Sequence, residues 1–357
     1  SFSLDANTTA SNNTAIGYLS GSAITTGASN TLLGSTAGDA ITTAANNTAV
    51  GHASLGAATT GVNNTAVGYL SGASLTTGNN NVAIGLNALS SDTLGDRAVA
   101  IGLGALGSQN FTSNTDNYNV AVGFNAGTAV TTGINNTLIG GLAGDAITTG
   151  YSNTGVGKSS LGGTTTGIKN SALGHGALLN NTTADNNTAV GYSALNANTT
   201  GTQGVAVGAN SLDANTTGVG NTAVGYDALT ANTTANYNTA FGRLALSTNT
   251  TGASNVAVGK NALLANTTAS NNTAVGVSSL AANTTGDQNV AVGRIALTSN
   301  TTGDYNVAIG PQAIDANTTG SQNVGMGYGA LGANTTADNN TGVGHFALIS
   351  NTTGTEN

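Results

Sequence analysis

The sequence predicts an all-β protein, a parallel β-solenoid (β-roll) of about 21 coils with a 17-residue repeat. The first observation is a motif, Asn-[Thr/Val]-Ala-[Val/Ile]-Gly, that recurs along all 357 residues, with 18 of its 19 intervals being 17 residues long. The second is that this period is too short for two packed helices but fits short strands and turns. The third is composition, because the motif is rich in Val, Ile and Thr and is bounded by Gly and Asn.

The glycine that closes the motif serves as a marker, and the other positions of a coil are counted from it. The marker glycines are Gly17, Gly34, Gly51, Gly68, Gly85, Gly102, Gly123, Gly140, Gly157, Gly174, Gly191, Gly208, Gly225, Gly242, Gly259, Gly276, Gly293, Gly310, Gly327 and Gly344.

The three residues before each marker predict a short strand. Thr or Val stands third before the marker in 19 of 20 coils, an apolar residue stands directly before it in all 20, and Ala lies between them in 15. Successive side chains of a strand point to opposite faces. We therefore expect the branched face to fill the coil's core and the alanine face to lie outside, as a flat apolar contact surface for another chain.

Asparagine stands fourth before the marker in 18 of 20 coils. In stacked coils such side chains can bond to the next coil's asparagine and to the turn backbone, so we predict a structural ladder. Its members are Asn13, Asn30, Asn47, Asn64, Asn81, Asn119, Asn136, Asn153, Asn170, Asn187, Asn221, Asn238, Asn255, Asn272, Asn289, Asn306, Asn323 and Asn340.

Two positions after the marker exchange one large aliphatic group. The fourth residue is usually Leu or Ile, but five coils have Gly there and instead carry an aliphatic seventh residue, as in Gly21 with Ile24. We infer that the two positions fill one core slot, because close packing keeps the volume constant. Leu229→Ala is then expected to cost ~2–5 kcal/mol, and isoleucine in place of Asn232 is expected to restore part of it.

We expect one elongated domain over residues 1–357, because a solenoid lengthens without needing a larger core. Residues 1–174 have mainly Ile/Leu-Thr-Thr-type turns and residues 175–357 have Asn-Thr-Thr turns. Four extra residues near 109–119 predict a bulged turn, with a binding loop as the alternative. Neither end carries a capping repeat, so we expect a segment of a longer array or head-to-tail joining.

The Asn-Thr-Thr turns are also acceptor sequences for N-glycosylation on turns expected to be exposed. The alternative is that the asparagines serve turn formation alone. The candidates are Asn7, Asn181, Asn198, Asn215, Asn232, Asn249, Asn266, Asn283, Asn300, Asn317, Asn334 and Asn351. A second set, one residue before the ladder, includes Asn12, Asn46, Asn63, Asn135, Asn186, Asn271 and Asn339.

Composition and motifs argue against several functions. With 6 Lys+Arg against 14 Asp+Glu there is no basic stripe for nucleic acid, and no apolar run is long enough for a membrane span. The chain has no cysteine. Its histidines, His52, His175 and His345, lie many coils apart without partners at ligand spacing, so we predict no metal site, no cofactor and no enzyme activity.

The residue directly after the marker varies widely and is often bulky, so we expect it at an outward corner. Lys158, His175 and Tyr192 follow one another in this column, and Arg243 stands beside Lys260. These five residues form a candidate adhesive corner for a sugar or protein, with a merely solvated corner as the alternative.

The unit Asn-[Thr/Val]-Ala-[Val/Ile]-Gly-x-x-[Ala/Ser]-Leu resembles the head repeats of trimeric autotransporter adhesins, and it is similar to repeats in phage tail fibres and bacterial surface fibres. The match covers essentially the whole chain. It implies a left-handed parallel β-roll, three chains side by side, and attachment outside a cell or virion. The repeat here is longer than in those heads, and residues 1–357 contain neither a coiled-coil stalk nor a membrane-anchor barrel.

These observations together predict a non-catalytic structural or adhesive extracellular fibre segment. Its expected partners are copies of itself, as a homotrimer and/or a head-to-tail filament, and a host surface protein or glycan. One alternative is an ice-binding solenoid that uses threonine rows such as Thr199 and Thr200, and another is a phage tail-fibre shaft or receptor-binding segment. A polysaccharide-cleaving solenoid would need carboxylate clusters that the columns lack.

Overall fold

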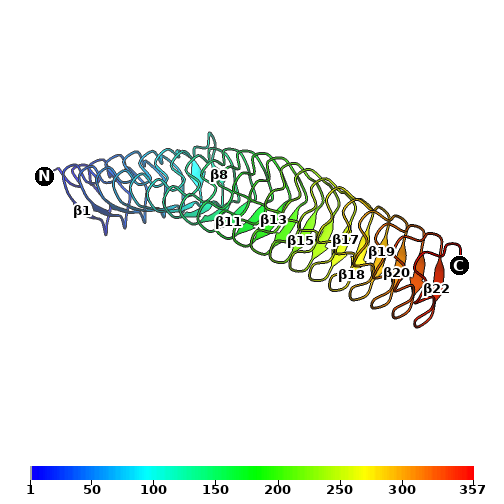
Figure 1. The fold of residues 1–357 in the computed structure, drawn as a ribbon. Helices are drawn as coiled ribbons and strands as arrows, with labels where there is room; N and C mark the ends of the chain where they lie inside the picture. Colours follow the sequence, from blue (N-terminus) through cyan, green and yellow to red (C-terminus); the bar gives the residue numbers. More distant parts are fainter. Residues whose placement is uncertain (1) are drawn as a thin grey trace. The chain divides into compact units, whose positions relative to one another are not determined.

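The computed structural model describes residues 2–357, which form strands and turns without a helix. The predicted parallel β-solenoid with a 17-residue repeat is confirmed. The chain divides into two compact units, with the boundary between Thr183 and Ala184. Within each unit, successive coils stack on one another (Figure 1).

Each coil of the described residues contributes one three-residue strand, and the insertion adds a short pair, β6 and β8. The first unit contains β1 (Thr14–Ile16), β2 (Thr31–Leu33), β3 (Thr48–Val50), β4 (Thr65–Val67), β5 (Val82–Ile84), β6 (Gly95–Asp96), β7 (Val99–Ile101), β8 (Thr115–Asp116), β9 (Val120–Val122), β10 (Thr137–Ile139), β11 (Thr154–Val156) and β12 (Ser171–Leu173). The second unit contains β13 (Thr188–Val190), β14 (Val205–Val207), β15 (Thr222–Val224), β16 (Thr239–Phe241), β17 (Val256–Val258), β18 (Thr273–Val275), β19 (Val290–Val292), β20 (Val307–Ile309), β21 (Val324–Met326) and β22 (Thr341–Val343).

Neighbouring strands within each unit pair in parallel and in register. Thr14 pairs with Thr31 in the first unit, and Val205 pairs with Thr222 in the second. The register survives the insertion, since Val99 still pairs with Val120, 21 residues further on. Identical columns of the sequence therefore become rows of identical side chains.

The two faces of the strand are the reverse of what the sequence predicts. The middle residue is buried, as Ala189 and Ala206 show at 0% exposure, whereas the branched residues on either side are half-buried or exposed. The reason is that the aliphatic side chain of position four fills the interior and leaves room for only a methyl group. A Cβ on Gly155 would lie 3.2 Å from Leu161 Cδ1, and one on Gly325 would lie 2.6 Å from Ile314 Cγ1.

The shared core slot is supported by the structure. A Cβ on Gly38 at position four would lie 2.7 Å from Ile41 Cδ1 at position seven, so the two side chains compete for the same space. The middle residue of the strand can also supply the aliphatic side chain that fills this slot. Leu32 replaces the usual alanine there and packs into the space above Gly21 and Gly38, with contacts of 2.7 and 2.9 Å to their ideal Cβ positions.

Residues with positive φ turn the chain at fixed positions of each coil. In the coil around Gly191, φ is 59° at Asn186, 139° at Gly191, 50° at Ser193 and 53° at Leu195. A Cβ on Gly191 would lie 2.5 Å from the carbonyl oxygen of Gly208, so close approach of stacked backbones also demands glycine there. Leucine in this conformation is strained, and burial at 0% exposure offsets that strain.

Asparagine ladders connect the coils. Asn13 Oδ1 accepts the backbone N–H of Asn30 at 2.9 Å, and Asn30 Nδ2 donates to the carbonyl of Ala44 at 2.9 Å. The same two bonds recur at Asn47, which donates to the Gly61 carbonyl at 2.9 Å. Because these side chains are buried, each bond satisfies a group that would otherwise be costly to hold away from water.

Candidate binding surfaces

The outward strand residues form a flat, largely apolar surface on each unit, which we call the sheet face. It consists of the residues third before and directly before each marker, such as Val290 and Val292 in β19. Its exposed members include Phe241 at 54%, Ile309 at 40% and Val292 at 36%. Since the strands pair in register, the face continues from coil to coil, and contiguous apolar surface of this kind indicates an interaction site.

The cations of the second unit border one side of its sheet face. Arg243, Lys260 and Arg294 are the only Lys or Arg residues of that unit, and each directly follows a marker glycine. All of them therefore lie just beyond the C-terminal ends of strands.

Carboxylates border the opposite side of the same face. Asp185, Asp287, Asp304 and Asp338 each stand six residues before a marker, ahead of the N-terminal end of a strand. Asp304 Oδ1 accepts the backbone N–H of Asp287 at 2.7 Å, so these side chains also hold neighbouring coils together. All the cations of the second unit thus follow the strands, together with Asp213, Asp227 and Asp315, whereas only carboxylates precede them.

The five residues of the candidate adhesive corner, Lys158, His175, Tyr192, Arg243 and Lys260, are all exposed. Lys158 and His175 occupy consecutive coils of the first unit, and Arg243 and Lys260 occupy consecutive coils of the second. Tyr192 belongs to the second unit, unlike Lys158 and His175.

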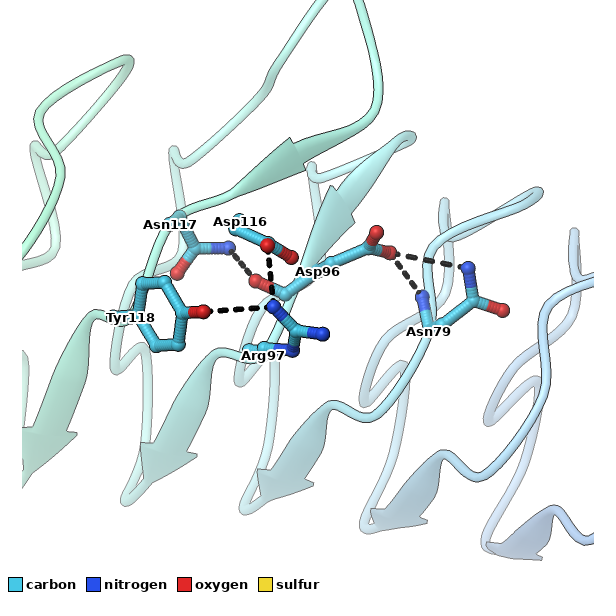
Figure 2. Close-up of polar contacts among 6 residues, drawn as sticks. All are labelled: Asn79, Asp96, Arg97, Asp116, Asn117 and Tyr118. Carbon is cyan, nitrogen blue, oxygen red and sulfur yellow. Dashed lines mark hydrogen bonds and ion pairs between the residues drawn. The ribbon is translucent and has the colours of Figure 1, made fainter.

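The insertion forms a short extra layer on the first unit (Figure 2). β8 pairs in parallel with β6, placing Asp116 opposite Asp96. Asn117 Nδ2 donates to the Asp96 carbonyl at 2.7 Å. Asp96 Oδ1 accepts the backbone N–H of Asn79 at 2.5 Å and its side-chain amide at 3.3 Å. The inserted residues are therefore tied to two preceding coils.

An ion pair covers the outside of this layer (Figure 2). The Arg97 guanidinium donates to the Asp116 carboxylate and to the Tyr118 hydroxyl at 2.7 Å, and it lies 5.5 Å from the Tyr118 ring centroid. Asp116, and after it Tyr118, raises the pKa of Arg97. Because the guanidinium already has these partners, we assign it to holding the insertion rather than to binding a ligand.

Beneath the insertion, a hydrogen-bonded set of polar side chains replaces the regular asparagine ladder. Asp92 is 0% exposed and accepts hydrogen bonds from Gln109 Nε2 at 2.7 Å and from the Gly95 backbone at 3.1 Å. Gln109 Oε1 in turn accepts from Asn119 Nδ2 at 2.8 Å. Burial raises the pKa of Asp92, although these hydrogen bonds oppose the shift. The group connects three successive coils where the regular asparagine ladder is interrupted by Ala98.

The expectation that the Asn-Thr-Thr asparagines lie exposed is wrong for ten of the twelve candidates. Asn249 shows why: its Nδ2 donates to Asn232 Oδ1 at 3.1 Å and to the Gly252 carbonyl at 2.9 Å, forming a second buried ladder. The amide nitrogen that would carry a glycan is therefore in use inside the coil. The buried candidates are Asn181, Asn198, Asn215, Asn232, Asn249, Asn266, Asn283, Asn300, Asn317 and Asn334, while Asn7 and Asn351 are half-buried.

The two threonines of each turn have different environments. Thr199 Oγ1 donates to the Thr216 carbonyl at 3.0 Å, whereas Thr200 is exposed. The first row is thus used to join coils, and only the second is presented to solvent.

A concave hollow in the second unit was not found from the sequence. It is lined by Gln312, Asp315, Tyr328, Gly329, Gly332 and Phe346, among other residues. The available signal is the pair of glycines at positions two and five of one coil, which removes two outward side chains at once.

Within residues 2–357, no group of three or more His, Cys, Asp or Glu residues is placed to hold a metal ion. None of these residues belongs to a helix that could cross a membrane. A comparison with known protein families finds no family model that matches the chain, and no curated protein matches it.

Proposed function

We propose that the chain is a non-catalytic structural segment of an extracellular fibre, which associates with copies of itself through the sheet face. The observation that supports this is the row of outward Thr, Val and Ile side chains that continues through each unit. Burying such a face against an identical face removes apolar surface from water at about 25 cal/mol per Å². The contact face is the branched one, and not the alanine face expected from the sequence.

The charges of the second unit favour parallel copies. When copies are related by rotation about an axis along the stack, facing strands run in opposite directions. The strand end of one copy then lies opposite the strand start of the same coil in its neighbour, which places Arg294 opposite Asp287, with Asp304 one coil further on. An antiparallel arrangement would place like charges together, which opposes association.

The resemblance to trimeric adhesin heads leads us to propose three copies in this parallel arrangement. Attachment to a surface protein or glycan would use the exposed corner residues of each unit, Lys158 with His175 in the first and Arg243 with Lys260 in the second. If glycans are added to the fibre, we propose the exposed asparagines one residue before the first ladder, such as Asn46 and Asn63, and not those of the buried second ladder.

The test is the mass of the protein in solution, measured by sedimentation equilibrium over a range of concentrations. We expect a trimer that dissociates when Val290→Lys places a charge on the sheet face. Thr302→Lys, which changes an exposed turn residue outside that face, serves as the matched control. A monomer at every concentration, or equal effects of the two variants, would refute the proposed interface.

Orientation is tested separately with engineered cysteines, because the chain has none. The double variant Thr341→Cys with Val343→Cys places one cysteine at each end of β22. In parallel copies the start of β22 in one chain meets the end of β22 in its neighbour, so oxidation should link two chains by a disulfide. In antiparallel second units β22 would lie opposite β13, and no disulfide should form.

A further inference from the structure

One coil of the second unit is hollowed because two of its outward side chains are missing. Gly329 and Gly332 occupy positions two and five of that coil, where the preceding coil carries Gln312 and Asp315. The resulting hollow is about 360 Å³. A Cβ on Gly329 would lie 2.6 Å from the ring of Phe346, so the ring of the following coil leans over the gap.

Two aromatic rings form a corner of this hollow. Tyr328 and Phe346 have centroids 5.2 Å apart and planes inclined at 67°, and they are 43% and 42% exposed. His345 stacks on Tyr328 at 5.5 Å with an angle of 17°, which supports the tyrosine ring in its position. Tyr328 and Phe346 meet edge to face, and His345 also contacts Phe346 with ring centroids 4.1 Å apart, so the three rings pack as one cluster whose exposed ring surface is available to a cation.

A carboxylate lines the preceding side of the same hollow. Asp315 has only its own backbone N–H as a hydrogen-bond donor among the described residues, and burial raises the pKa of its carboxyl group. No Lys or Arg residue lines the hollow. A bound cation would offset the desolvation of this carboxylate, and the net charge of −8 on the chain favours cation approach.

We propose that this hollow binds a quaternary ammonium group such as that of choline. The trimethylammonium end would contact the exposed parts of the Tyr328 and Phe346 rings, and its positive charge would face the Asp315 carboxylate. The size of the hollow is at the lower end of the range for small-ligand sites, about 300–1,000 Å³. This proposal concerns a small-molecule site and does not depend on the self-association proposed above.

The first unit contains a coil with glycine at the same two positions, which serves as an internal comparison. Gly104 and Gly107 remove the same two side chains from their coil, but the flanking residues at position two are Asn87 and Asn125. A Cβ on Gly104 would lie 2.4 Å from Asn125 Oδ1, so an amide occupies the place that Phe346 has in the second unit. We expect this coil to bind no ammonium group, because it lacks both the ring and the carboxylate.

The experiment is an NMR titration of the full chain with choline chloride, with sodium chloride at equal ionic strength as the blank. We expect saturable shifts in the millimolar range, confined to aromatic resonances of Tyr328, His345 and Phe346. Neutral 3,3-dimethylbutanol, which has the same shape without the charge, should bind about fivefold more weakly or worse. A parallel titration with phosphocholine distinguishes two sources of the quaternary ammonium group. If phosphocholine binds as strongly as choline, a lipid or polymer headgroup is indicated, and if it binds more weakly, free choline is indicated.

Four variants locate the site. Asp315→Asn and Gly332→Leu are each expected to weaken choline binding about fivefold or more, the first by removing the charge and the second by filling the hollow. Asp145→Asn and Gly107→Leu make the same changes at equivalent positions of the first unit and should leave binding unchanged. Thermal melts of each variant verify folding, and Asp315→Asn changes no core contact.

Three results would overturn the proposal: equal binding of choline and dimethylbutanol, equal loss in the first-unit controls, or saturable binding of methyl glucoside at these rings without any binding of choline.

Discussion

The shared core slot predicts that one coil can be converted into the other type. Leu55 lies at position four and Ala58 at position seven, between coils that carry Ile41 and Leu75 at position seven. Leu55→Gly empties the slot, and Ala58→Ile refills it from the other position. The double variant would then have an unbroken row of aliphatic side chains at position seven.

The magnitudes follow from burial and backbone conformation. Leu55 is 0% exposed, so truncating it alone should cost ~2–5 kcal/mol. Its φ of 50° is strained for leucine, and glycine should recover about 1 kcal/mol of that strain. In the double variant, Ala58→Ile adds three buried carbon atoms, which should stabilise the fold by about 2 kcal/mol. Beside an intact Leu55 the same isoleucine should overfill the slot and destabilise the fold by ~1–3 kcal/mol.

The double variant is therefore expected within ~1 kcal/mol of the parent chain, with a coupling energy of about 2 kcal/mol or more. The assay is native-state hydrogen exchange of backbone amides in β3 and β4, which measures the local free energy of opening in the full chain. The matched control is Leu229→Gly with Asn232→Ile. The rescue at residue 232 that the sequence predicts is not expected in the folded chain, because Asn232 Nδ2 donates to Asn215 Oδ1 at 2.9 Å and its loss breaks the second ladder. Additive effects of the two changes at residues 55 and 58 would refute the shared slot.

Three further predictions concern single groups. Asn266→Ala should destabilise the second unit by ~2–4 kcal/mol in exchange measurements, because it leaves the buried Asn283 Nδ2 and Asn249 Oδ1 without their ladder partner; a loss below 1 kcal/mol would contradict this. Arg97→Ala should speed amide exchange in the insertion while leaving the melting temperature unchanged, since the ion pair is exposed; a clear fall in melting temperature would show a larger role. The pKa of Asp92 is raised above its ordinary 3.8 in the folded chain, so the folded state holds the proton more tightly. Exchange protection around the insertion should thus decrease as pH rises through and above 3.8, and Asp92→Asn should remove that dependence.

The repeat was readable from the sequence because every coil has to solve the same packing problem. Glycine at the marker, where stacked backbones approach closely, leaves a column that no other residue can fill, as Gly191 shows. The exchange between Gly38 and Ile41 was also visible, since constant interior volume forces correlated changes within one coil.

The sequence could not show which face of each strand points into the interior. Alternation shows that two faces differ, but both faces here are apolar, so the pattern does not say which is inside. Which face is buried depends on the leucine at position four. Its side chain reaches the strand centre only because a φ near +50° turns it inward, as at Leu195. The same holds for Asn198, whose sequence fits an exposed turn but whose side chain is buried at 0% exposure.

By itself, the order of residues determined the period, the strand positions, the turn glycines and the column of bonded asparagines, because each follows from a local rule repeated in every coil. Only the tertiary structure decided which face is outward, which asparagines are enclosed, and that Asp315, Tyr328 and Phe346 line one hollow. Those outcomes depend on contacts between residues of neighbouring coils, and the available space there is set by side chains that stand about 17 positions away in the chain.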